Sequence, residues 1–217
     1  MNSKGTILYI HGMGGGADSR IPGILGDCFS SADMPDVVVR TYDFNPDKAA
    51  GQIASWMEEL HPDMLIGESL GASHALAARK DTMPVLLVSP ALNAPLLFSR
   101  LAFLTAVPGV GTLLDRIYRP RPGERQSIHF CRTNLRGWAG LRNDALRRSP
   151  AHAMTFAFFG DNDHYRRSGI VSIKTWKRFF GDGSFSIYHG THFMEEEHVR
   201  SVLKEKILEM LGDRGHQ

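Results

Sequence analysis

The chain has 217 residues, of which 42% are hydrophobic and 22% are charged, and its formal net charge is only +2. These values suit one globular domain with a substantial core, and so small a net charge gives no indication of a nucleic-acid partner. Cys28 and Cys131 have neither metal-ligand spacing nor the density of a disulfide framework. No secretory signal or membrane span is predicted, because residues 1–5 lead straight into an apolar run and proline and glycine interrupt the stretch 101–114. We therefore expect a cytoplasmic protein.

Short β-branched or aromatic runs alternate with longer helical patterns along the chain. This alternation is typical of an α/β protein, so we predict a three-layer α/β/α sandwich with a mainly parallel sheet, formed by residues 1–217 as a single domain. We expect each run to be apolar on both faces, as central strands of a parallel sheet tend to be. The six predicted strands are residues 6–10, 37–42, 64–66, 85–88, 155–159 and 185–188. Apolar residues at helical spacing predict helices over residues 53–60 and 195–212.

Residues 92–150 break the alternation between the fourth and fifth predicted strands. Their leucine, phenylalanine and tryptophan content argues against a disordered loop. A bend rich in proline and glycine at 108–111 divides an apolar part from an arginine-rich part. We expect a small inserted cap that lies over the strand ends and shapes a pocket.

The most informative motif is Gly-Glu-Ser-Leu-Gly at residues 67–71, which follows a predicted strand and precedes a run of small, helix-favouring residues. In a nucleophile elbow, a serine is held at the tip of a tight strand-to-helix bend, where flanking glycines relieve crowding. The pattern predicts Ser69 as a nucleophile. The alternative is a surface serine in a turn bounded by glycines.

A nucleophilic serine needs a general base and a third group that orients the base. His192 follows the last predicted strand in a Gly-Thr-His-Phe loop and is the predicted base, with His189 and His74 as weaker alternatives. The orienting acid is expected after the strand at 155–159, in the sequence Gly-Asp-Asn-Asp. We predict Asp163 in preference to Asp161, because the third position after the glycine lets the chain turn back toward the histidine loop. Asp161 is expected to bond turn amides.

The first predicted strand leads into a His-Gly-Met-Gly-Gly loop at residues 11–15, which resembles an oxyanion loop. Charge that develops on a carbonyl oxygen needs preset donors. The backbone amides of Met13 and Leu70 are the predicted pair, while His11 is expected to bond within the loop.

The loop at 11–15, the elbow, the Gly-Asp-Asn-Asp loop and the Gly-Thr-His-Phe sequence together resemble the α/β-hydrolase superfamily, and in particular its compact bacterial esterase-like members. The order Ser, Asp, His along the chain matches that family, and the resemblance covers nearly everything except residues 92–150. It implies an α/β-hydrolase fold and a serine hydrolase that cleaves an ester or related acyl bond without a cofactor.

Two rival interpretations stay open at this stage. Residues 12–17 also fit a loose G-x-G-x-x-A dinucleotide fingerprint, with Asp43 in the place of a ribose-binding acid. That interpretation leaves Ser69, Asp163 and His192 unexplained. The second rival is a hydrolase-like fold that only binds, since a fold does not guarantee chemistry.

The substrate is indicated only by charge. Residues 115–148 contain nine arginines and only three acidic residues. One interpretation is a small acyl ester substrate that carries an anionic group, because arginine matches carboxylate geometry; the other is a solvated surface. No patterned motif for nucleic acid or acidic lipid accompanies the arginines. Ester, thioester and amide substrates all fit the motifs, and nothing in the sequence indicates an oligomeric state.

Overall fold

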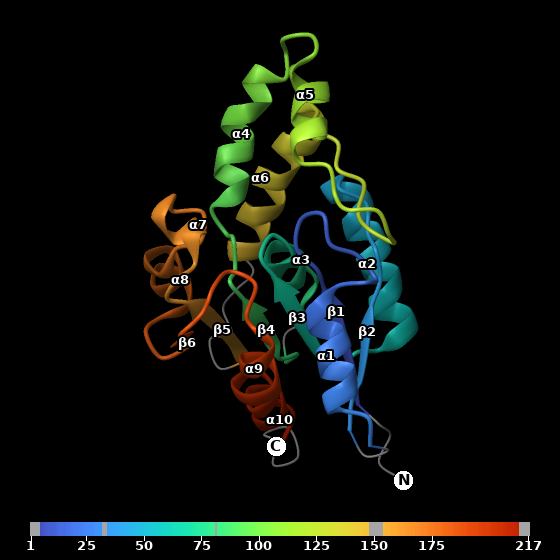
Figure 1. The fold of residues 1–217 in the computed structure, drawn as a ribbon, viewed down its shortest axis with the longest axis vertical. Helices are drawn as coiled ribbons and strands as arrows, with labels where there is room; N and C mark the ends of the chain where they lie inside the picture. The colour runs from blue at the N-terminus through green and yellow to red at the C-terminus, as the bar shows by residue number, and fades with distance from the viewer. Residues whose placement is uncertain (1–4, 32–33, 81, 148–153, 213–217) are drawn as a thin grey trace.

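The computed structural model describes residues 5–31, 34–80, 82–147 and 154–212. Six parallel strands form one sheet in the order β2-β1-β3-β4-β5-β6 (Figure 1). The strands are β1 (Thr6–Ile10), β2 (Asp36–Val39), β3 (Met64–Glu68), β4 (Val85–Val88), β5 (Thr155–Gly160) and β6 (Phe185–Tyr188). The predicted α/β fold class is confirmed.

Helices cover both faces of the sheet, because the apolar side chains of its central strands alternate between two cores. In β1, Leu8 and Ile10 belong to one core, whereas Ile7 and Tyr9 belong to the other. The first core is closed by α2 (Pro46–Leu60), α3 (Gly71–Ala78), α6 (Arg132–Arg147) and α8 (Ile173–Phe180). The second is closed by α1 (Arg20–Cys28), the π-helical segment η2 (Val199–Leu203) and α10 (Lys204–Gly212). Two short helices, α7 (His164–Arg167) and α9 (Glu196–His198), precede α8 and η2.

Two expectations about the strands are wrong. The second strand ends at Val39 rather than at residue 42, because the chain leaves the sheet and Tyr42 packs beside the loop after β1, where its hydroxyl donates to the His11 carbonyl at 2.6 Å. The outer strands β2 and β6 are also partly exposed rather than buried on both faces. An edge strand has a neighbouring strand on one side only, so fewer residues surround its side chains.

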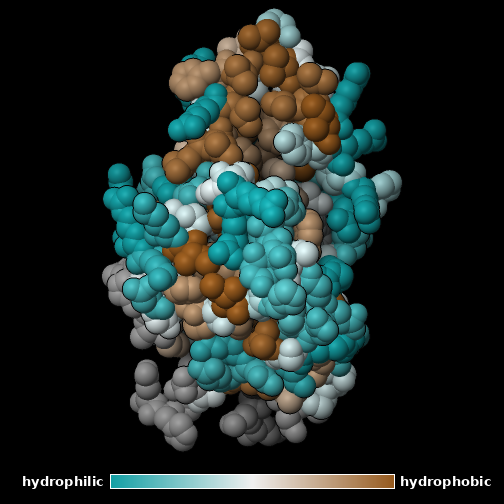
Figure 2. Space-filling model, turned by 60° about the vertical axis from the view of Figure 1, so that its left-hand side comes forward, coloured by the Kyte–Doolittle hydropathy of each residue, from teal (hydrophilic) through white to brown (hydrophobic). Residues whose placement is uncertain are grey.

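The described part of the segment between β4 and β5 contains three helices. It begins with α4 (Ala94–Leu104) and α5 (Val110–Ile117), which protrude beyond the carboxyl ends of the strands (Figure 1). α6 then returns to the helical layer and buries Leu135 and Trp138. Only the part before α6 therefore stands out from the sandwich, and Figure 2 shows hydrophobic residues gathered on it. Its action as a cap stays a prediction, and residues 148–150 lie outside the described residues.

Within the described ranges, no helix has the length and apolarity needed to cross a bilayer.

Candidate active site

Ser69 occupies the sharp bend between β3 and α3, and its backbone has a left-handed φ of +50°. This conformation is strained for a residue with a side chain, and such strain gathers at functional sites. The flanking glycines make the bend possible. A Cβ on Gly67 would lie 2.8 Å from the Ala75 Cβ, and a Cβ on Gly71 would collide with the His11 carbonyl. The elbow motif thus adopts the backbone that its spacing predicts.

An unbroken chain of hydrogen bonds joins the three side chains predicted from the motifs. His192 Nε2 lies 2.8 Å from Ser69 Oγ, and His192 Nδ1 lies 2.8 Å from Asp163 Oδ2. The side chains of His192 and Asp163 are 3% and 0% exposed, so water competes little for the contact between them. Tyr165 packs its ring edge-on against the imidazole, with the ring centroids 4.6 Å apart. The imidazole is therefore fixed on two sides.

The two candidate acids have different surroundings. Asp163 caps the N-terminus of α7 by accepting a hydrogen bond from the Tyr165 amide at 2.8 Å, so both its oxygens are used. Asp161 instead contacts His189 Nδ1 at 2.8 Å on the exposed side of the loop. The hydrogen bond from His189 lowers the pKa of Asp161 below its usual range. Asp161 also accepts a hydrogen bond from the Gly190 amide at 3.0 Å, so it bonds a loop amide as expected and joins its loop to the loop after β6.

Contacts that the motifs did not reveal hold the loop that carries His192. The Tyr188 hydroxyl donates to the Thr191 carbonyl at 2.6 Å. Arg20, from the start of α1, donates to the Met194 carbonyl at 2.5 Å. Arg20 is 174 residues from Met194, so no local pattern could have indicated this pairing.

The loop after β1 passes directly beside the elbow. A Cβ on Gly12 would lie 3.1 Å from the Ser69 Cβ, so glycine permits the close approach. In the described part of the chain, the backbone amides of Met13 and Leu70 have no acceptor within the protein. Two such amides flanking a serine fit the expected donors, and their assignment as an oxyanion hole stays a prediction.

Beneath this loop lies a buried group of aromatic side chains. His11 stacks on Tyr42 at a centroid distance of 4.2 Å, and His74 meets the rings of Tyr42 and Trp138 edge-on. Burial lowers the pKa of His11 to about 4, and burial together with the nearby His11 lowers the pKa of His74 to about 3. Both imidazoles are therefore neutral near pH 7. The Nε2 atoms of these two histidines have no hydrogen-bond partner among the described residues.

The segment between α5 and α6 is hydrogen-bonded to the loop after β1. The side-chain carbonyl of Gln126 accepts a hydrogen bond from the Gly14 amide at 3.1 Å, and the backbone amide of Gln126 donates to the Gly15 carbonyl at 2.7 Å. Gln126 is 1% exposed, and no motif indicated its role. The geometry of the loop beside Ser69 thus depends on the inserted segment.

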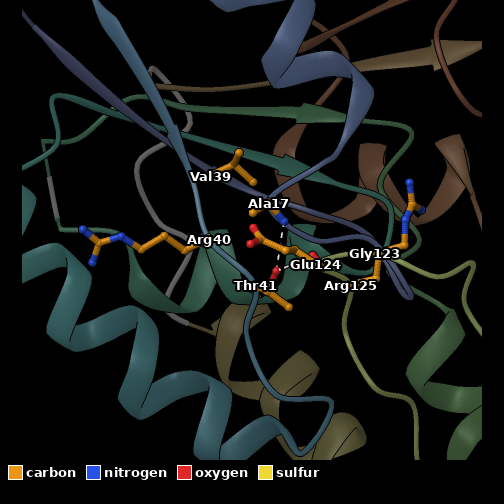
Figure 3. A pocket seen from close by; sticks show the side chains of 7 residues that line it. All are labelled: Ala17, Val39, Arg40, Thr41, Gly123, Glu124 and Arg125. Atoms are coloured by element: carbon orange, nitrogen blue, oxygen red, sulfur yellow. Dashed lines mark hydrogen bonds between the residues drawn. The ribbon is translucent and has the colours of Figure 1, made fainter.

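A surface hollow of about 420 Å³ borders this junction (Figure 3). Thr41 lies at its centre, where its hydroxyl accepts a hydrogen bond from the Ala17 amide and donates to the Glu124 carbonyl. The two arginines of the hollow are already paired, Arg40 with Glu59 and Arg125 with Asp18. None of the three hydrogen-bonded side chains of the elbow site lines it, so we regard it as a seam between segments. The lining residues are Ala17, Val39, Arg40, Thr41, Gly123, Glu124 and Arg125.

The geometry does not fit dinucleotide binding. In a dinucleotide site the glycine-rich turn opens directly into a helix whose N-terminus faces the pyrophosphate. Here α1 begins at Arg20, ten residues after β1 ends, and Gly12 lies against Ser69. Asp43 accepts a hydrogen bond from the Asn45 amide ahead of α2. Within the described ranges, no group of three or more histidine, cysteine or acidic residues is placed to hold a metal ion.

Comparison with known proteins agrees with this architecture. No family model matches the chain, and no curated protein matches its sequence. Solved structures do match. Est1E from Butyrivibrio proteoclasticus, determined with ferulic acid bound, has a TM-score of 0.66 at 16% identity, over 96% of this chain and 90% of that one.

A pyrethroid hydrolase from Sphingobium faniae has a TM-score of 0.58 at 14% identity, over 99% of this chain and all of that one. The α/β-hydrolase domain-containing protein 10 from mouse has a TM-score of 0.54 at 15% identity, over 96% and 90% of the two chains. The protein has the α/β-hydrolase fold. At these identities the matches establish the hydrolase fold alone.

Proposed function

We propose that the protein is a serine hydrolase that cleaves the ester or a related acyl bond of a small substrate, with Ser69, His192 and Asp163 as its catalytic triad. The observation that carries the proposal is the continuous hydrogen bonding, at 2.8 Å and 2.8 Å, from the serine on the strained elbow to the buried carboxylate. The structural likeness to esterases and other hydrolases supports the same reaction class.

The proposed reaction has two steps. An ionised Asp163 only accepts hydrogen bonds, so His192 carries its proton on Nδ1 and leaves Nε2 free to accept the Ser69 proton. Ser69 Oγ then attacks the carbonyl carbon, and the amides of Met13 and Leu70 stabilise the oxyanion. His192 returns its proton to the leaving group as the acyl-enzyme forms. Water, deprotonated by His192, attacks the acyl carbon; the bond to Ser69 Oγ then breaks, His192 returns the proton to Oγ, and the acid is released.

The anionic-substrate hypothesis depends on the arginines of residues 116–148, and two of them already have partners within the protein. Arg125 is paired with Asp18, and Arg142 donates to the Leu92 carbonyl at 2.5 Å, so both guanidiniums are engaged. Arg148 lies outside the described residues. If arginines bind the acyl group, an ester with a free carboxylate should have a higher kcat/KM than a neutral ester of equal length. Equal kcat/KM values would reject the hypothesis.

The test of the proposed function is covalent labelling with a fluorophosphonate, followed by intact-mass spectrometry and peptide mapping. The wild type should gain a single adduct on Ser69, and Ser69→Ala should gain none. Ser73→Ala is the matched control. Ser73 is a buried serine of α3, about one turn after Ser69, and its hydroxyl has no hydrogen-bond partner among the described residues. This variant should label like the wild type. A wild type that stays unlabelled would instead indicate a hydrolase fold that binds without catalysis.

A further inference from the structure

The protruding part of the molecule exposes apolar side chains to an unusual degree. We define the tip as residues 94–121, which include α4 and α5. Of the ten large hydrophobic residues that are exposed in the described part of the chain, eight belong to the tip. Figure 2 shows hydrophobic residues gathered at the top of the molecule, over this part of the chain. The eight exposed residues of the tip are Leu96, Leu97, Phe103, Leu104, Val107, Leu113, Ile117 and Tyr118.

Tertiary packing leaves much of the apolar side of α5 uncovered. Its apolar residues Val110, Leu113, Leu114 and Ile117 recur at helical spacing, yet none of them is buried. Leu114 contacts the core, whereas Leu113 and Ile117 are 56% and 64% exposed. Large contiguous apolar patches on a soluble domain usually mark an interaction surface.

The charge around this surface is positive. The tip contains four arginines, and all four are exposed. Its one acidic residue, Asp115, is occupied, because its carboxylate contacts His129 Nδ1 at 2.7 Å and accepts a hydrogen bond from the Phe130 amide at 2.6 Å. The tip therefore combines an apolar surface with cationic side chains and no free carboxylate. The four arginines are Arg100, Arg116, Arg119 and Arg121.

We propose that the tip docks on the surface of a lipid bilayer that contains anionic lipids. Leu113, Ile117 and their exposed neighbours would enter the boundary between headgroups and acyl chains, as the apolar side of an interfacial helix does. The arginines would bind lipid phosphates. A second copy of this chain fits less well, because two tips packed face to face would oppose arginine to arginine. Docking also orients the carboxyl ends of the strands, where Ser69 lies, toward the membrane (Figure 1).

The experiment measures how the full-length protein partitions onto sedimented vesicles of phosphatidylcholine alone and of phosphatidylcholine mixed with phosphatidylglycerol. The wild type should bind the mixed vesicles better, and added salt should weaken that binding. The variant with Leu113→Asp and Ile117→Asp should lose at least about tenfold in partitioning. Arg116→Gln and Arg119→Gln should each lower binding to mixed vesicles about fivefold.

Matched controls separate docking from general surface effects. Ile187→Asp alters an apolar residue of β6 that is 50% exposed outside the tip, and Arg178→Gln removes an exposed charge from α8. Both should bind like the wild type. So should Ser69→Ala, because docking does not depend on the proposed hydrolase activity. Sedimentation velocity without vesicles measures whether the protein forms a dimer, and so tests a second copy of this chain as the partner.

Three results would overturn the proposal. The first is equal binding of the wild type to both kinds of vesicle, or no binding to either. The second is a loss of binding in Ile187→Asp as large as in the tip variant. The third is a wild type that is dimeric and does not bind vesicles, together with a tip variant that is monomeric. This result would identify the tip as an interface between copies.

Discussion

Lowering the pH should destabilise the protein through the two buried imidazoles beneath the active-site loop. Folding lowers the pKa of His11 to about 4 and of His74 to about 3, chiefly because burial disfavours their charged forms. In the unfolded chain a histidine has a pKa of about 6.5. Below this value the unfolded state binds protons that the folded state excludes. The contribution of His11 and His74 to the free energy of unfolding is therefore fully present above pH ~6.5. It is lost as the pH falls toward their folded-state pKa values.

The size of the effect follows from proton linkage. At pH 5, protonation of each histidine in the unfolded state lowers the free energy of unfolding by about 2 kcal/mol relative to pH 8, or about 4 kcal/mol for the pair. The variant His74→Leu has a side chain of similar volume that does not titrate. It should therefore lose about 2 kcal/mol less than the wild type over this range.

Urea unfolding at pH 8 and pH 5 measures this difference. His164→Gln is the control, because His164 is an exposed residue of α7 outside the buried group, and this variant should follow the wild type. Other titrating groups contribute to the wild type and to the variants alike, so comparison of the variants isolates His74. If His74→Leu loses as much stability as the wild type, His74 is not held neutral by burial and the reasoning is refuted.

Three further predictions concern the active-site scaffold. Gly71→Ala should lower the free energy of unfolding by at least about 2 kcal/mol, because its Cβ would collide with the His11 carbonyl, whereas Gly51→Ala in open space on α2 should raise it by up to about 1 kcal/mol; similar unfolding curves for the two variants would contradict this. Asp163→Asn should lower kcat/KM by about 10³- to 10⁴-fold and Asp161→Asn by less than about tenfold, and steady-state kinetics that show the reverse order would make Asp161 the orienting acid. Gln126→Met removes the acceptor of the Gly14 amide, so kcat should fall by about tenfold through misplaced oxyanion donors while the thermal unfolding temperature changes little; an unchanged kcat would show that the inserted segment does not position this loop.

Local patterns predicted the elements that local physics controls. The ends of β1, β4 and β6 match the predicted strands, because each strand is a short apolar run bounded by polar or turn-forming residues. The tight bend at Ser69 was also predictable, since the glycines that flank it relieve crowding. The choice of Asp163 over Asp161 depended on loop spacing, and the contact of Asp163 with His192 agrees with it.

The prediction of β2 was wrong because the stretch from Val37 to Tyr42 places its apolar residues in two different environments, on either side of the polar Arg40 and Thr41. Its first residues pair with β1, whereas Tyr42 packs on His11 beneath the active-site loop. Apolar periodicity reports burial and does not say against which partner the side chain is buried. Composition likewise argued against disorder in residues 92–150, but it did not indicate that most leucines and phenylalanines of residues 96–118 lie exposed in the structure.

The sequence by itself determined the order of strands and helices, the bend at Ser69 and the residue types that can perform acyl transfer, because these depend on neighbours within a few positions. Only the tertiary structure decided which of these residues meet. His192 and Ser69 are 123 positions apart, Gln126 and Gly14 are 112 apart, and Arg20 and Met194 are 174 apart. Such contacts arise from the packing of the whole sheet and its helices, as does the exposure of the tip. Because hydrophobic association is non-directional, the pattern of a single sequence does not indicate which residues each apolar side chain packs against.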